Sequence, residues 1–200
     1  MVEQSSESTI IVGNPSVVRG RRASLIYSEK RPNLLVYAIR DNLIFRNMAN
    51  PAESRVYADH RSRITCVTEQ KTAGKFAFGD EKGMVTVVTL KENGEITKDK
   101  EFQLLAQEVN QVLWSNDGTR LIAVGFGTDT KANAVTYDTG SKCGTILGIT
   151  TNQLCADLAQ IDKKYALFSA GEGNEIMYHE GIPFKGQGVG SGAVHSNFIN

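Results

Sequence analysis

Residues Arg63 to Leu90 read RITCVTEQKTAGKFAFGDEKGMVTVVTL, and this stretch decides the fold. Three short runs rich in β-branched and aromatic residues are separated by the sequences Lys-Thr-Ala-Gly and Asp-Glu-Lys-Gly, which favour turns. Runs of this kind are typical of antiparallel β-strands. Sustained 3.6-residue periodicity is missing, and the best helical candidate, residues 100–111, changes quickly into strand-like sequence. The sequence therefore predicts an all-β protein.

The same order of strands and turns recurs on both sides of this stretch. It returns in three further blocks, at residues 23–45, 109–138 and 153–178. An apolar or aromatic marker stands near the end of each third strand, at Phe45, Val88, Tyr137 and Tyr178. These markers are 43, 49 and 41 residues apart. A period of about 40–45 residues with four strands per unit is typical of WD40-type β-propellers, whose small sheets bury both faces only by stacking.

The repeat divides the chain into an N-terminal arm with a ring-closing strand, four blades and the start of a further blade. We expect these units, in order, at residues 1–22, 23–58, 59–104, 105–149, 150–194 and 195–200. The Trp-Asp pair that names WD repeats is poorly kept, and Tyr137-Asp138 is its nearest match. The expectation therefore rests on period and strand order. Four blades are few for a closed ring, so we expect open blade edges that favour self-association.

Charge and composition exclude several functional classes. The chain has 22 basic and 22 acidic residues, so it lacks the basic surplus that nucleic-acid binding usually needs. Residues 1–100 carry 16 basic and 12 acidic side chains, whereas residues 101–200 carry 6 and 10. The N-terminal sequence is polar and acidic, unlike a signal peptide, and the apolar runs are too short to span a bilayer. Three widely spaced cysteines indicate reduced thiols, and we expect a cytoplasmic protein without membrane contact.

The sequence predicts no catalytic, cofactor-binding or metal-binding residues. Of the three histidines, His60 and His195 stand at blade-entry positions, where a histidine forms hydrogen bonds within its blade, and the third is His179. Metal-binding HExxH spacing and a Gly-x-Ser-x-Gly nucleophile elbow are missing from the sequence. The glycine-rich stretch 186–192 lies between strands and has no lysine, which favours a blade loop over a phosphate-binding loop. An interaction protein is favoured over an enzyme housed in a propeller.

Aromatic residues divide into core and interface candidates. Those on predicted strands are expected in the core, at Phe76, Phe78, Phe102, Trp114 and Phe168. Three others stand where loops or strand edges are expected on the propeller face, at Phe126, Phe184 and Phe198. Exposed aromatic side chains are the usual anchors of protein interfaces, so these three are candidates for partner binding.

Five stretches are more specific than a generic repeat, namely Leu43–Pro51, Val56–His60, Leu113–Gly125, Tyr137–Ser141 and Glu180–Lys185. In this order they resemble the actin-interacting protein 1 family, the WD-repeat cofactors of cofilin. The similarity is patchy but extends over about residues 10–200. The resemblance implies a parent chain of about 600 residues with two propellers of about seven blades each. It also implies that this sequence is a portion of the N-terminal propeller.

The resemblance further implies partners and contact residues. Family partners are cofilin/ADF and actin, and members act at the cytoskeleton, where they promote disassembly of cofilin-decorated filaments. Contact positions carried over from the family are Phe126, Asp129, Glu172, Phe184, Lys185 and Phe198. Two residues depart from the family pattern, because Phe126 replaces a loop glutamate and Gly186 replaces the last aromatic of the Pro-Phe-Lys-Phe run. A WD-repeat scaffold for a different multiprotein complex is the alternative.

Overall fold

The computed structural model describes residues 13–18, 24–146, 149, 151–161, 164–172, 176–181 and 185–188. Most of these residues lie in β-strands and in the turns that join them, and one short 3-10 helix, η1, occupies Pro51–Glu53. Within this part of the chain, no helix has the length and apolar character that a membrane span requires. The expectation of an all-β protein is confirmed.

The strands form four antiparallel sheets, and each sheet consists of four strands that follow one another in the chain. Sheets 1 and 2 contain β1 (Leu25–Tyr27), β2 (Leu34–Ile39), β3 (Asn42–Asn47) and β4 (Arg55–Tyr57), then β5 (Ile64–Glu69), β6 (Lys75–Asp80), β7 (Met84–Leu90) and β8 (Ile96–Gln103). Sheets 3 and 4 contain β9 (Val109–Trp114), β10 (Arg120–Gly125), β11 (Ala132–Thr136) and β12 (Lys142–Thr145), then β13 (Gln153–Ile161), β14 (Lys164–Gly171), β15 (Ile176–Glu180) and β16 (Lys185–Gly188).

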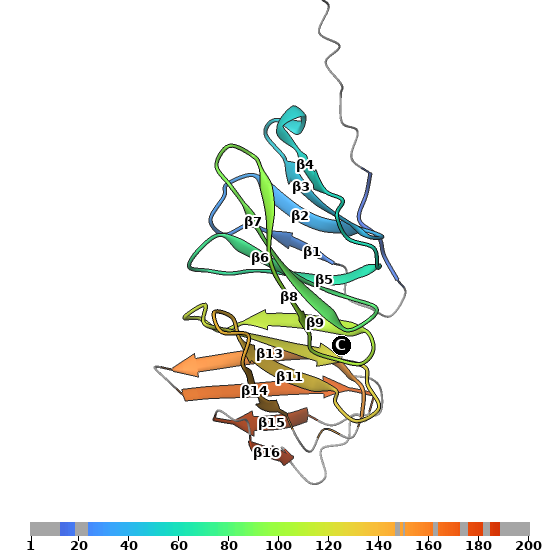
Figure 1. The fold of residues 1–200 in the computed structure, drawn as a ribbon, viewed down its shortest axis with the longest axis vertical. Coiled ribbons are helices and arrows are strands. Elements are labelled where there is room, and N and C mark those ends of the chain that lie inside the picture. Colours follow the sequence, from blue (N-terminus) through green and yellow to red (C-terminus); the bar gives the residue numbers. More distant parts are fainter. Residues whose placement is uncertain are drawn as a thin grey trace, which may run out of the picture.

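The four sheets are stacked in chain order (Figure 1). Strand β5 packs against β1 and β9, and β9 packs against β13, so the first strand of each sheet adjoins the first strand of the next. Small four-stranded sheets that meet through their first strands are propeller blades, and the predicted WD40-type fold class is confirmed. We propose that the blades occupy residues 23–58, 59–104, 105–149 and 150–194. The predicted closing strand at 9–12 and the start of a blade at 195–200 lie outside the described residues.

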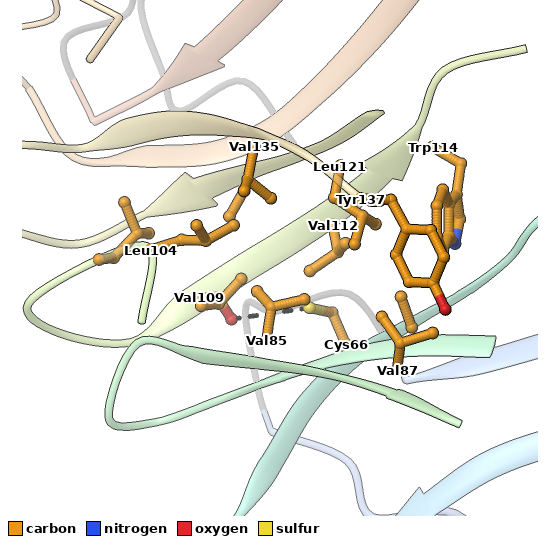
Figure 2. Close-up of a cluster of buried hydrophobic side chains, with 13 residues drawn as sticks. Cys66, Val85, Val87, Leu104, Val109, Val112, Trp114, Leu121, Val135 and Tyr137 are labelled. Atoms are coloured by element: carbon orange, nitrogen blue, oxygen red, sulfur yellow. Dashed lines mark hydrogen bonds between the residues drawn. The ribbon is translucent and has the colours of Figure 1, made fainter. Parts of the chain in front are cut away.

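A hydrophobic cluster fills each interface between neighbouring sheets. Between sheets 1 and 2, the buried rings of Phe45 and Phe76 meet edge to face with their centroids 5.1 Å apart. Between sheets 2 and 3, Trp114 and Tyr137 belong to a second cluster with a centroid distance of 5.4 Å (Figure 2). Leu167 of sheet 4 belongs to a third cluster, with residues of sheet 3. Because side chains alternate along a strand, each inner sheet serves two interfaces.

Polar contacts tie the same sheets together. Gln70 Nε2 of sheet 2 donates a hydrogen bond of 2.7 Å to the carbonyl oxygen of Gly118 in sheet 3. Tyr137 of sheet 3 stands where the tryptophan of a Trp-Asp pair is expected, and its hydroxyl lies 2.9 Å from Lys75 Nζ and 3.2 Å from Asp99 Oδ2 of sheet 2. Lys75 Nζ also lies 2.6 Å from Asp99 Oδ2. The substituted aromatic thus adds a cross-sheet hydrogen-bond network.

The expected core positions of the aromatic residues are confirmed in part. Phe76, Phe78 and Trp114 are buried, and Phe102 is half-buried against the cluster between sheets 2 and 3. Phe168 is 40% exposed, so its assignment to the core was wrong. It lies on β14 beside the buried Leu167, and strand alternation directs it to the outer face of sheet 4, away from sheet 3.

Candidate interaction surface

One end of the stacked sheets gathers the turns between second and third strands and the connections between sheets. Strand directions place these segments at the same end, on the right of Figure 1. We call this end the loop face, and it comprises residues 40–41, 58–63, 81–83, 104–108, 126–131, 151–152 and 172. Backbone hydrogen bonds join turns to connections within it. The N–H of Phe126 donates to Glu108 O over 2.8 Å in sheet 3, and the N–H of Glu172 donates to Asn152 O over 3.1 Å in sheet 4.

Two glycines force the backbone into this close approach. Gly125 and Gly171 end the second strands of sheets 3 and 4, each beside a register shift in the pairing with the first strand. A Cβ atom on Gly125 would lie 2.2 Å from Glu108 O, and one on Gly171 would lie 2.0 Å from Asn152 O. A side chain cannot be accommodated at such distances. The residues that follow, Phe126 and Glu172, therefore occupy equivalent positions on neighbouring sheets.

The structure brings three of the predicted contact residues to the loop face. Phe126 is half-buried, whereas Asp129, in the same turn, and Glu172, on the neighbouring sheet, are exposed. Glu172 is also positioned from the side, because Asn152 Nδ2 donates a hydrogen bond of 2.8 Å to its Oε2. A partly covered aromatic ring thus lies on the same surface as two exposed carboxylates. The grouping suits a partner that offers an apolar contact next to positive charge.

The other predicted contact residues do not join this group in the described structure. Lys185 begins β16 opposite Glu180, at the end of sheet 4 that lies away from the loop face. Phe184 and Phe198 lie outside the described residues.

Sequence reasoning did not identify the ion pairs of the loop face around sheet 2. Arg63 Nε lies 3.1 Å from Glu81 Oε2, and Arg63 Nη2 lies 3.3 Å from Glu108 Oε1 of the connection that enters sheet 3. His60 Nε2 lies 3.2 Å from Asp80 Oδ2 in the same blade, and both side chains are nearly inaccessible to solvent. The blade-entry role expected for His60 is therefore structural. The available signal was an aspartate at the end of the second strand that follows a blade-entry histidine.

Asp80 organises its own turn through two further hydrogen bonds. Its Oδ1 accepts from the backbone N–H groups of Lys82 and Met84, both at 2.9 Å. Burial raises the pKa of Asp80, but the contact with His60 and these two N–H donors outweigh burial. The pKa of Asp80 therefore lies below its ordinary value of 3.8 in the folded state.

We expect the Asp80 carboxylate to contribute to stability above its ordinary pKa of 3.8, and this contribution to vanish as the pH falls through the lower folded pKa. The variant Asp80→Asn should lower the free energy of unfolding by about 1 kcal/mol at neutral pH and flatten the acid side of the stability profile. Urea denaturation at a series of pH values measures both effects. The exposed Asp59→Asn is the matched control, and a profile for Asp80→Asn as steep as that of the control would contradict the assignment.

Metal-binding and catalytic geometry were also sought. In the described ranges, no group of three or more His, Cys, Asp or Glu side chains is placed to hold a metal ion. A pocket of about 460 Å³ lies between sheets 1 and 2, at the end away from the loop face. Its walls carry Arg31, Arg55 and Lys91 above the apolar Leu34 and Phe45, and its lining contains no histidine, cysteine or serine. It does not combine a nucleophile with a base.

Four-stranded sheets stacked through their first strands, with loops gathered at one end, define the class of WD-repeat propeller proteins. No family model matches the chain. WD repeat-containing protein 1-B of Xenopus laevis is 28% identical over 186 residues, which cover 93% of this chain and 30% of the relative. Actin-interacting protein 1 of Drosophila melanogaster is 29% identical over 171 residues, which cover 86% of this chain and 28% of the relative.

Actin-interacting protein 1-2 of Arabidopsis thaliana is 28% identical over 187 residues, again with 93% of this chain and 30% of the relative covered. The predicted resemblance to actin-interacting protein 1 is thereby confirmed as a distant relationship. The chain spans about 30% of the length of the curated relatives that it matches.

Proposed function

We propose that this chain is a non-catalytic module that binds cofilin-decorated actin filaments at the cytoplasmic cytoskeleton and promotes their disassembly. Two of its relatives are named actin-interacting protein, which supports actin as a partner. The structural observation that carries the proposal is the placement of Phe126, Asp129 and Glu172 on one face of two neighbouring sheets. We propose Phe184, Lys185 and Phe198 as further contacts of the same partner.

The physical basis of the proposed activity is differential binding. A protein shifts the equilibrium between an intact and a weakened filament only by the difference between its affinities for the two states. The half-buried Phe126 supplies a contact that is already partly ordered, so little conformational entropy is lost on binding. The carboxylates of Asp129 and Glu172 add charge that steers association and selects a partner surface of opposite sign. No bond is made or broken in this activity.

Co-sedimentation with actin tests the proposal. We expect the chain to pellet with filaments in the presence of cofilin, and filament mass in the pellet to fall as more of the chain is added. Without cofilin, both effects should be weak. Binding that is indifferent to cofilin would contradict the proposal and favour a scaffold of another kind.

Charge reversal on the loop face should weaken this binding. We expect the double variant Asp129→Lys/Glu172→Lys to bind cofilin-decorated filaments about tenfold more weakly, with its thermal unfolding unchanged, because both side chains are exposed. The matched control is Asp138→Lys, which changes an exposed aspartate in the turn between β11 and β12, at the opposite end of sheet 3. Equal losses for the double variant and the control would place the binding surface elsewhere.

A further inference from the structure

The two end sheets of the stack both present apolar side chains on their outer faces. On sheet 1, Leu25 is 42% exposed and Val56 is 38% exposed. On sheet 4, Phe168 is 40% exposed and Ile176 is 38% exposed. Buried interfaces in the rest of the stack are lined by side chains of the same kinds. Apolar surface of this sort favours association.

The two outer faces correspond to the two sides of an interface between blades. The register shifts align Cys66 of β5 with Cys155 of β13, and from there Ala77 of β6 with Phe168 of β14. Cys66 and Ala77 lie on the face of sheet 2 that packs against sheet 3. The outer face of sheet 4 is therefore the kind of face that receives a following blade. The outer face of sheet 1 points away from sheet 2 and is the kind that receives a preceding blade.

Charges at the two ends are complementary. The first hundred residues carry 16 basic and 12 acidic side chains, a surplus of 4 positive charges, and the second hundred carry 6 and 10, a surplus of 4 negative charges. On the outer face of sheet 1, Arg46 lies opposite Leu35 in the strand pairing, and its buried Nε has no hydrogen-bond partner among the described residues. On the outer face of sheet 4, the exposed Asp157 lies opposite Phe168. These charges favour the pairing of sheet 1 with sheet 4 over the pairing of like ends.

The N-terminal arm covers only part of the outer face of sheet 1. Tyr37 donates a hydrogen bond of 2.7 Å to Gly13 O, and the N–H of Ser16 donates to Ala38 O over 2.9 Å. Tyr37 is fully buried, whereas Leu25, which is opposite it in the strand pairing, stays exposed. The first strand of sheet 1, through which blades meet, is thus available for contact.

We propose that two copies of this chain associate head to tail, with sheet 4 of each copy packed on sheet 1 of the other. Each contact repeats the blade-to-blade packing already present three times within the chain. Two copies with four sheets each form a ring of eight blades, within the range of about four to eight that closed propellers use. Both heterologous contacts are satisfied when the ring closes, so growth stops at two copies.

Light scattering coupled to size-exclusion chromatography tests the proposal in the absence of actin. We expect a mass of twice 21.8 kDa as protein concentration rises. A monomer at every concentration would overturn the proposal, as would a ladder of larger assemblies, which shows that the ring does not close. Because actin is absent, this result is independent of the proposed actin binding.

Substitutions identify the faces involved. We expect Phe168→Asp and Leu25→Asp each to raise the dissociation constant of the dimer at least tenfold, since each removes one side of both contacts. Met48→Asp is the matched control, because Met48 is 53% exposed in the turn after β3, away from both outer faces. Circular dichroism checks that all three variants keep their β-structure. A dimer that survives Leu25→Asp but not Phe168→Asp would indicate a symmetric contact of two fourth sheets and would overturn the head-to-tail arrangement.

Discussion

Substitution of Gly83 by alanine is expected to destabilise the protein by about 3 kcal/mol or more. Gly83 has φ +86°, and an added Cβ would lie 2.0 Å from the backbone oxygen of Leu105. The carbonyl oxygen of Gly83 accepts hydrogen bonds from the N–H groups of Leu104 and Leu105, at 3.1 and 3.2 Å. The side chain would therefore push the connection between sheets 2 and 3 away from the turn that holds it. Urea denaturation followed by circular dichroism measures the loss.

Gly74→Ala provides the matched control. Gly74 also has positive φ, +62°, but an added Cβ would meet no atom within 4 Å. This variant carries only the strain of the left-handed backbone, about 1 kcal/mol. Equal losses for the two glycine variants would contradict the close packing of the β6–β7 turn against the sheet connection.

The second large effect is expected for Phe76→Ala, which should lower the free energy of unfolding by about 3–5 kcal/mol. Phe76 is fully buried on β6, in the cluster between sheets 1 and 2. Its removal leaves a cavity beside Phe45 and abolishes the edge-to-face contact at 5.1 Å. Chemical denaturation at a protein concentration low enough to keep the chain monomeric measures the change.

Phe168→Ala is the corresponding control, because Phe168 occupies the second strand of its own sheet, β14, but is 40% exposed. We expect a loss below about 1 kcal/mol in the monomer, since little apolar surface returns to water. A loss as large as that of Phe76→Ala would show that the outer face of sheet 4 is covered within the chain. Such a result would also remove the basis for head-to-tail association.

The sequence predicted the blades because their signals are local. Alternating apolar runs bounded by glycine-containing turns depend on a few neighbouring residues, and stretches such as Lys75–Asp80 and Arg120–Gly125 became strands in the expected order. The burial of individual aromatics was less accessible. Phe76 and Phe168 stand in similar strand sequences, but only the position of the sheet within the stack decides whether a neighbouring blade covers the side chain.

The candidate site was predictable in its residues rather than in its geometry. Gly125-Phe126 and Gly171-Glu172 repeat a glycine at the end of a strand, yet only the close contacts to Glu108 and Asn152 show that the two positions are equivalent. The placement of Lys185 at the other end of sheet 4 depends on the direction of β16, which the resemblance could not supply.

Imaging of single actin filaments that carry both cofilin-coated and bare segments tests the central claim most directly. Fluorescently labelled chain should accumulate on the coated segments, which should then shorten, whereas the variant Asp129→Lys/Glu172→Lys should show neither effect at the same concentration. Equal density of the labelled chain on coated and bare segments would contradict the account, because a protein without differential affinity cannot shift filaments toward disassembly.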